Sequence, residues 1–306
     1  MINSYLMDMI ACPACRSVLK ETGGMLACAK CGEKYGIDDG IPVLIPRETY
    51  MDIKEILPAW DEMWNKTPMH DPAAVEKEED IASAYNHVKP LWDKYGKENF
   101  MEAGCGSGRM LYLMGRNNIR VIGMDLSVSA LKFFKKFMAL SGIKDCHFVC
   151  GDMRRMPFKD EAIGFIYGGG SIEHFEETQS AVTEINRIMK KGSLVSLTYP
   201  YISLATLTYR QMYGNIPEFP VLKQLGRFLH ITLLRKKLMR FGYEKSFFIG
   251  TMEKYFGKAG FSGIHSGLFD TYLQIALFKS EKIKDLLRKI SANRLFWPMV
   301  YTNGIK

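Results

Sequence analysis

Two cysteine pairs near the start of the chain are the first residues whose spacing could do chemistry. Cys12 and Cys15 form one Cys-x-x-Cys pair, and Cys28 and Cys31 form a second, within a compact unit of residues 1–46. Four thiolates can hold a structural Zn²⁺ tetrahedrally, and so small a unit needs the folding energy that a metal supplies. Two redox-active pairs are the alternative, which the presence of both pairs in one small β-rich unit disfavours.

A glycine-rich segment forms the second set, and its positions are Glu102, Gly104, Cys105, Gly106 and Gly108. Glycines let the chain turn tightly at the carboxyl end of a strand and approach a ligand closely. The dinucleotide fingerprint would place its third glycine where this chain has Arg109. The carboxylate of Glu102 would also repel a pyrophosphate and attract an ammonium group. The pattern therefore favours S-adenosylmethionine over a dinucleotide.

Two further acidic positions follow predicted strands and complete a candidate cofactor site. Asp125, followed by Leu126, ends an apolar strand, where a carboxylate can accept both ribose hydroxyl hydrogens. Asp152 could accept from an adenine amino group, while the backbone N–H of Met153 could donate to the ring. The alternative for Asp152 is a turn or the N-cap of a helix.

A loop expected next to that site carries the candidate catalytic residues. It runs from residue 168 to 175 and contains Gly169, which we place beside the cofactor, and then Glu173 and His174. His174 could remove a proton from a hydroxyl acceptor. Alternatively, Glu173 and His174 cap and hold the following helix, since transfer from a sulfonium often needs only alignment. Tyr85, on a helix expected over residues 80–95, could close over the cofactor or simply pack.

The elements that must position these residues alternate between strand and helix. We expect strands at residues 99–103, 121–125, 147–150, 163–167 and 194–199. Helices fit between them, which predicts a parallel sheet covered on both faces. Residues 263–269 and 272–278 are joined too tightly for a helical crossover and should form an antiparallel hairpin.

Two family resemblances rest on these residues. Residues 8–46, with both cysteine pairs and the run from Tyr35 to Leu44, resemble the short zinc-ribbon proteins that activate tRNA, rRNA and release-factor methyltransferases. Residues 80–279, with Gly104, Asp125 and Asp152, resemble class I S-adenosylmethionine-dependent methyltransferases. The second resemblance implies a Rossmann-like α/β fold with strand order 3-2-1-4-5-7-6. It also implies that Gly104, Asp125, Asp152 and Met153 bind the cofactor. Gly164 departs from that family's pattern, which often has Asp there.

The resulting organisation has four parts. Residues 1–46 form a β-rich zinc ribbon, 47–80 a connector, 81–280 a methyltransferase domain with a helical lid insert at 201–258, and 281–306 an amphipathic helix and tail. The lid insert is aromatic and basic, which suits an apolar substrate with an anionic head group, a membrane surface or an RNA groove. A helical cap with a solvated basic side is the plain alternative.

Composition restricts the possible classes of function but does not select one of them. The net charge of +8 favours an anionic partner, although a merely basic enzyme has the same balance. Seven cysteines in a metal pattern with spare thiols predict a reducing, cytoplasmic setting, and we see no secretory signal or membrane span. We expect a methyl acceptor that is a small molecule or lipid-like, with RNA binding or peripheral membrane contact as further options. The sequence implies no stable protein partner, and a non-catalytic binding protein is the third alternative.

Overall fold

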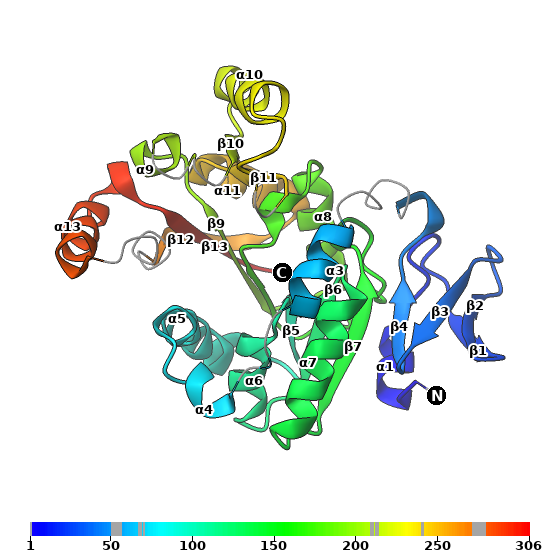
Figure 1. Cartoon of the computed structure of the whole chain (residues 1–306). Coiled ribbons are helices and arrows are strands. Elements are labelled where there is room, and N and C mark those ends of the chain that lie inside the picture. Colours follow the sequence, from blue (N-terminus) through cyan, green and yellow to red (C-terminus); the bar gives the residue numbers. More distant parts are fainter. Residues whose placement is uncertain are drawn as a thin grey trace.

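The computed structural model describes residues 2–49, 57–66, 69, 71–208, 211, 214–239, 242–270 and 280–306. Its centre is a mixed sheet whose strand order is β1-β2-β3-β4-β7-β6-β5-β8-β9-β13-β12 (Figure 1). The sheet joins the N-terminal unit to the rest of the chain without a break. A doubly wound α/β domain therefore continues at one edge into a small β-rich unit.

The parallel part of the sheet follows the predicted alternation closely. Its strands are β5 (Phe100–Ala103), β6 (Val121–Asp125), β7 (Cys146–Gly151), β8 (Ile166–Gly169) and β9 (Leu194–Pro200). They pair in parallel with one another, and nearly every residue in them is buried. Burial on both faces explains why these strands read as continuous apolar runs.

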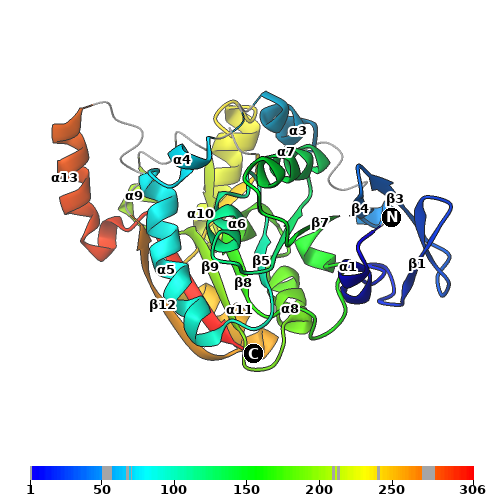
Figure 2. The same cartoon turned by 90° about the horizontal axis from the view of Figure 1, so that it is seen from below.

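Helices cover both faces of the sheet (Figure 2). One face packs against α4 (Pro72–Val75), α5 (Glu79–Tyr95), α6 (Arg109–Gly115) and α7 (Val128–Leu140). The other face packs against α1 (Ser4–Met9), α8 (Thr178–Ile188) and α11 (Ile249–Ala259). Such two-sided cover is what a parallel sheet requires, and it leaves the carboxyl ends of the strands open for a site.

The last strands differ from the predicted hairpin. The strand that lies between β9 and β12 (Ser262–Asp270) is β13 (Met299–Ile305), which is antiparallel to both. The order 3-2-1-4-5-7-6 is thus kept, but its seventh strand comes from the end of the chain. Residues 272–278, which we expected in that role, lie outside the described residues. Within the expected tail, α13 (Glu281–Ser291) and the short helix η5 (Arg294–Phe296) precede β13.

The N-terminal unit adds the remaining strands of the sheet. They are β1 (Leu19–Thr22), β2 (Met25–Cys28), β3 (Lys34–Asp38) and β4 (Ile41–Leu44), which form an antiparallel meander. β4 then pairs in parallel with β7, with Val43 opposite Cys150 and Leu44 opposite Gly151. The apolar run at 41–44 is therefore buried between two parts of the chain.

The insert between β9 and β12 is mixed where we expected mostly helix. It contains α9 (Leu204–Leu207), β10 (Asn215–Pro217), α10 (Pro220–Arg227), the π-helical η4 (Phe228–Leu233) and β11 (Glu244–Ser246), and it leads into α11. β10 and β11 pair in parallel as a separate two-stranded sheet. The connector contributes α3 (Leu57–Lys66), which packs against α7.

The absence of a side chain at Gly164 has a steric cause. A Cβ atom there would lie 1.4 Å from the carbonyl oxygen of Lys97. The aspartate that the related family often carries at this position therefore cannot be accommodated by this backbone.

Candidate active site

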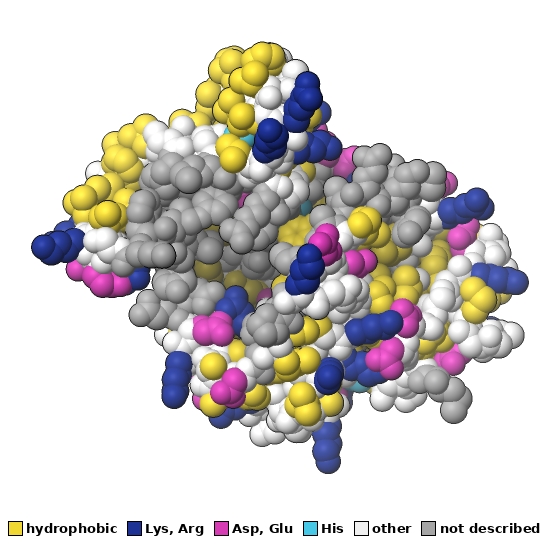
Figure 3. All heavy atoms as spheres, in the orientation of Figure 1, with side chains coloured by type: hydrophobic (Ala, Val, Ile, Leu, Met, Phe, Trp, Pro, Cys, Tyr) yellow, Lys and Arg dark blue, Asp and Glu magenta, His cyan; other side chains and the backbone are white. Residues whose placement is uncertain are grey.

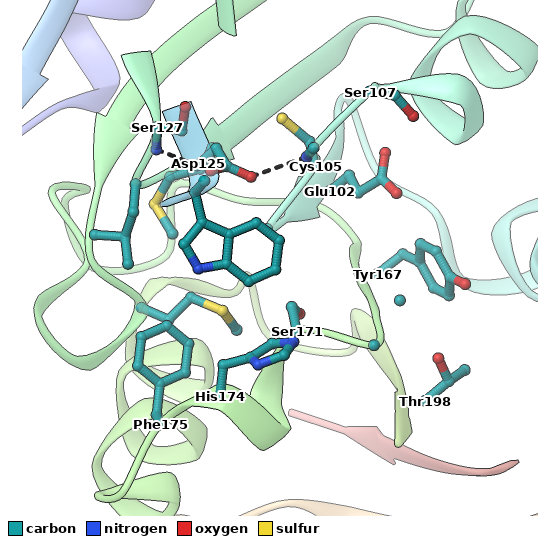
Figure 4. Close-up of a pocket in the computed structure, with 18 of the residues that line it drawn as sticks. Glu102, Cys105, Ser107, Asp125, Ser127, Tyr167, Ser171, His174, Phe175 and Thr198 are labelled. Atoms are coloured by element: carbon teal, nitrogen blue, oxygen red, sulfur yellow. Dashed lines mark hydrogen bonds between the residues drawn. The ribbon is translucent and has the colours of Figure 1, made fainter. Parts of the chain in front are cut away.

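A cavity of about 750 Å³ opens at the carboxyl ends of β5, β6 and β8. Most of the predicted cofactor residues line it, namely Glu102, Gly104, Cys105, Gly106, Asp125, Leu126, Met153 and Gly169. Figure 4 shows Glu102, Tyr167 and Thr198 on one side of this cavity and His174 and Phe175 on another. The topology thus brings together residues that lie far apart in the sequence.

The glycine loop is held against the end of β6 by Asp125. One carboxylate oxygen of Asp125 accepts from the backbone N–H of Gly106 at 2.9 Å, and the other accepts from Ser127 at the same distance. Gly106 has a φ of +46°, and a Cβ atom on it would approach the Trp64 ring to 2.9 Å. Burial raises the pKa of Asp125 above its ordinary value, while the backbone N–H donors oppose that rise.

Glu102 is a buried carboxylate with an unsatisfied oxygen. Its Oε2 atom has no hydrogen-bond partner among the described residues, although the side chain lines the cavity. Desolvation raises its pKa to about 8, against the opposing charge of Arg109. Because an unpaired buried acid is costly, this position is suited to a cationic ligand group.

Three predicted cofactor residues do not face the cavity. The carboxylate of Asp152 is fully buried, caps the short helix η1 (Met153–Arg155) and pairs with the Arg154 guanidinium at 2.8 Å. The alternative N-cap role is observed, and the adenine contact stays a prediction that this orientation of the side chain does not support. Gly108 instead leaves room for the Phe134 ring, which a Cβ atom would approach to 2.1 Å. The Tyr85 hydroxyl accepts from Asn117, so this residue packs and does not close the cavity.

The two candidate catalytic residues differ in whether they line the cavity. His174 lines the cavity, and its Nδ1 donates to the backbone carbonyl of Tyr243 at 2.7 Å. In the tautomer that makes this bond, Nε2 carries the lone pair and can accept a proton. Glu173 is buried and is not among the residues that line the cavity, so its catalytic role stays a prediction.

Two tryptophans of α3, Trp60 and Trp64, also line the cavity. Trp60 meets the His174 ring edge-on with centroids 5.4 Å apart, and Trp64 lies over Gly106. Asp61, between them, accepts from the Ser127 hydroxyl at 2.6 Å. The one-turn spacing of the two indoles was the available signal, but nothing in it indicated which surface they cover.

Charged residues at the wall of the cavity connect it to the insert. Glu176 pairs with Arg227 of α10 at 2.9 Å, and both line the cavity. The Lys245 ammonium of β11 is buried and donates to the Glu176 carbonyl and to Thr178. The insert is therefore attached by polar contacts to the loop that carries His174.

The four cysteines of the N-terminal unit form a separate site. Their sulfur atoms lie within 4.8 Å of one another, with Cys12 and Cys31 3.6 Å apart and Cys15 and Cys28 3.4 Å apart. A tetrahedron with metal–sulfur bonds of about 2.3 Å needs sulfur atoms about 3.8 Å apart. The hydroxyl of Tyr35 lies 3.3 Å from the Cys12 sulfur, where it can donate to a thiolate. These residues fit a structural zinc ion.

Comparisons with known protein families agree with both family resemblances, that of the zinc ribbon and that of the methyltransferase domain. Residues 101–197 match the model of the methyltransferase domain, and residues 3–40 match that of Trm112p-like protein. An uncharacterized chloroplastic methyltransferase of Arabidopsis thaliana is 29% identical over 155 residues, which are 49% of this chain and 40% of that protein. A 24-methylenesterol C-methyltransferase of the same plant is 26% identical over 153 residues, with 47% and 40% covered. The chain spans less than half the length of either relative.

A solved structure shows the same fold. A S-adenosylmethionine-dependent methyltransferase of Mesorhizobium loti superposes with a TM-score of 0.51 at 15% identity and covers 73% of this chain and 98% of that one. The chain therefore joins a class I methyltransferase domain to a Trm112-like domain, as both resemblances implied.

Proposed function

We propose that this protein transfers a methyl group from S-adenosylmethionine to a small-molecule or lipid-like acceptor, by O- or N-methylation. The observation that carries the proposal is the cavity in which the unsatisfied Glu102 carboxyl and the Asp125 carboxylate flank one glycine loop. The alternative cofactor, a dinucleotide, would bring a pyrophosphate against Glu102.

The residues present fit this cofactor. Glu102 would hold the ammonium of its amino-acid end, and Asp125 would accept from the ribose hydroxyls. Met153, which also lines the cavity, would donate its backbone N–H to the adenine ring. When bound, S-adenosylmethionine supplies an electrophilic methyl group on a sulfonium sulfur. Trp64 and the glycine loop would form one wall beside that group.

His174 would act on the acceptor. An electron pair of the acceptor oxygen or nitrogen forms the new bond to the methyl carbon, and the carbon–sulfur electron pair stays on the departing sulfur. The acceptor proton passes to Nε2 of His174, whose ring is fixed by the Nδ1 bond to the Tyr243 carbonyl. The cavity walls align the acceptor with the methyl group, and this alignment contributes the rest of the rate enhancement.

A second candidate is an RNA methyltransferase. It is supported by the Trm112-like match, the net charge of +8 and the basic insert. RNA binding should weaken steeply with salt, because each phosphate contact releases counterions. A gel shift with bulk tRNA or rRNA at two salt concentrations tests it, and the absence of a shift at low salt ends it.

The experiment that tests the acceptor class is an untargeted transfer assay. Zinc-loaded protein is incubated with methyl-labelled S-adenosylmethionine and with cell lysate fractionated into RNA, lipid and small-molecule pools. The proposal expects label in the lipid or small-molecule pool. Label confined to RNA would favour the second candidate, and cofactor binding without label in any pool would favour a non-catalytic binding protein.

A further inference from the structure

Helix α10 presents its apolar side outward. The side chains of Val221, Leu225 and Phe228 follow a helical stripe and are 62%, 60% and 59% exposed. The opposite side of the helix is in contact with β10 through the buried Gly226. A helix on the surface of a soluble domain normally buries its apolar stripe.

The cations of the same helix point toward the body of the protein. Lys223 pairs with Glu218 at 3.0 Å, and Arg227 pairs with Glu176. The neighbouring His230 is buried against Gln211. Lys223, Arg227 and the Nε2 atom of His230 thus have partners within the protein, whereas the apolar stripe faces outward.

The stripe continues along one rim of the molecule. β10 is in contact with α10 and α9, α9 with η5, and η5 with α13. Exposed apolar side chains are found on all of the helices in this row. We call this set the apolar rim: Leu204, Leu207, Phe219, Val221, Leu225, Phe228, Leu229, Leu233, Ile283, Leu286 and Leu295. Figure 3 shows hydrophobic side chains gathered over α10 and over the edge near α9 and α13.

Cations without acidic partners border the apolar rim. Arg235, Lys236 and Lys237 follow η4, and Lys282 and Lys289 lie on α13. All five are exposed, and none forms an ion pair within the described part of the chain. Exposed apolar side chains flanked by unpaired cations are the pattern of a helix that lies in the interface of an anionic bilayer.

We propose that the apolar rim binds the surface of an anionic lipid bilayer, with α10 and α13 lying in its interfacial region. A bilayer fits better than a protein partner because both helices project from the body as convex ridges (Figure 1). A stable protein interface requires a complementary surface, whereas a fluid bilayer adapts to ridges.

The apolar rim lies next to the cavity. Arg227 and Ile231 line that cavity from the same helical segment that carries Leu225 and Phe228. If the proposed function holds, the methyl acceptor is then an amphiphile that enters from the bilayer. Binding of the rim to vesicles does not itself depend on methyl transfer.

The test is vesicle sedimentation with the zinc-loaded full chain. One set of vesicles is phosphatidylcholine alone, and the other contains about 30% phosphatidylglycerol, enough to give a negative surface potential. We expect binding to the anionic vesicles that weakens as the salt concentration rises from about 0.05 to 0.5 M. The double substitution Leu225→Ser and Phe228→Ser should lower the partition coefficient by about tenfold or more, since two apolar side chains leave the bilayer.

Two controls keep the outcome interpretable. Leu140→Ser changes a leucine that is 67% exposed on α7, away from the apolar rim, and should bind like the unchanged protein. Calorimetry with S-adenosylmethionine should give the same affinity for the double variant, because neither residue lines the cavity. Failure of the unchanged protein to sediment with anionic vesicles would overturn the proposal. So would a dimer that the double substitution converts to monomer while no vesicle binding occurs.

Discussion

Glu102 is the residue whose environment reports most directly on the ligand. Its carboxyl is buried beside the glycine loop, and desolvation raises its pKa to about 8. Without a ligand it is therefore mostly protonated near pH 7. An ammonium placed beside it stabilises the carboxylate, so binding and deprotonation are linked.

We predict that the affinity for S-adenosylmethionine rises with pH between about 6 and 7.5, by at most about tenfold per unit. One proton per ligand should be released at the acidic end, which calorimetry in buffers of different ionisation enthalpy measures. Above about pH 8 the ligand ammonium itself loses its proton, so the rise should stop. Glu102→Gln is the matched control, and an unchanged pH dependence in it would contradict the assignment.

Asp125 is predicted to be indispensable for cofactor binding. Asp125→Ala removes the acceptor for the ribose hydroxyls and also the bonds that hold Gly106 and Ser127. We expect the affinity to fall by about 100-fold or more, from the loss of two or more charge-assisted hydrogen bonds. Ser171→Ala, which removes a hydroxyl that donates to the Ala103 carbonyl, provides a milder change in the same wall. Equal affinity in Asp125→Ala and the unchanged protein would refute the site.

For His174 the decisive quantity is the rate of methyl transfer at saturating cofactor. His174→Ala should lower it by about 100-fold or more if Nε2 is the base. Cofactor affinity should change little, since the ring is expected to face the acceptor. A rate loss of only a few-fold would leave the residue a structural support for the Tyr243 carbonyl contact.

At this scale the sequence indicated that Glu102, Asp125 and two of the glycines lie at one cavity, because each follows a predicted strand end, while their binding roles stay predictions. It could not decide the orientation of Asp152, which pairs with Arg154, an arginine only two positions away. Nor could it show that Trp60 and Trp64 cover the glycine loop, because that contact depends on how α3 lies across α7.

Among the elements, the pairing of β4 with β7 links the two domains most tightly. β7 leads directly into the segment from Gly151 to Met153 that borders the cavity. The chain before β1 is also tied there, since Ile10 bridges to Phe158 and Lys159 donates to the Met9 carbonyl. The N-terminal domain therefore supports one wall of the cavity.

Removal of the metal should consequently weaken the cofactor site as well as unfold the cysteine-bearing unit. We predict that a zinc chelator, or Cys12→Ser, lowers the melting temperature and the cofactor affinity, the latter by about 5- to 100-fold. Cys146→Ser, outside the cysteine cluster, is the matched control. Full retention of cofactor affinity by chelated protein would show that the β4–β7 seam carries no such coupling.

The strand alternation from residue 99 to 200 could be predicted because each strand is a short buried apolar run between helical patterns. The seventh strand could not, since Met299–Ile305 contains Thr302 and Asn303 and is separated from β12 by a helix. Its polar residues are satisfied inside the sheet, as in the bond between Tyr199 and Thr302, which sequence patterning does not reveal.

The whole molecule combines an open cavity with an outer surface on which the exposed apolar side chains are unevenly distributed. None of the described helices is long and apolar enough to cross a bilayer. The exposed apolar side chains nevertheless concentrate on the insert and on α13, beside cations that form no ion pair among the described residues (Figure 3). Composition alone gives the sign of the net charge. That the cations of α10 point toward the body of the protein could be seen only in the structure.

The central claim is that the cavity beside Glu102 and Asp125 binds S-adenosylmethionine. Isothermal titration calorimetry of the zinc-loaded full chain with S-adenosylmethionine, S-adenosylhomocysteine and NAD tests it most directly. We predict one site for each of the first two ligands, lost in Asp125→Ala, and no binding of NAD. Binding of NAD at that site, or the absence of binding by either S-adenosyl ligand to folded protein, would contradict the account.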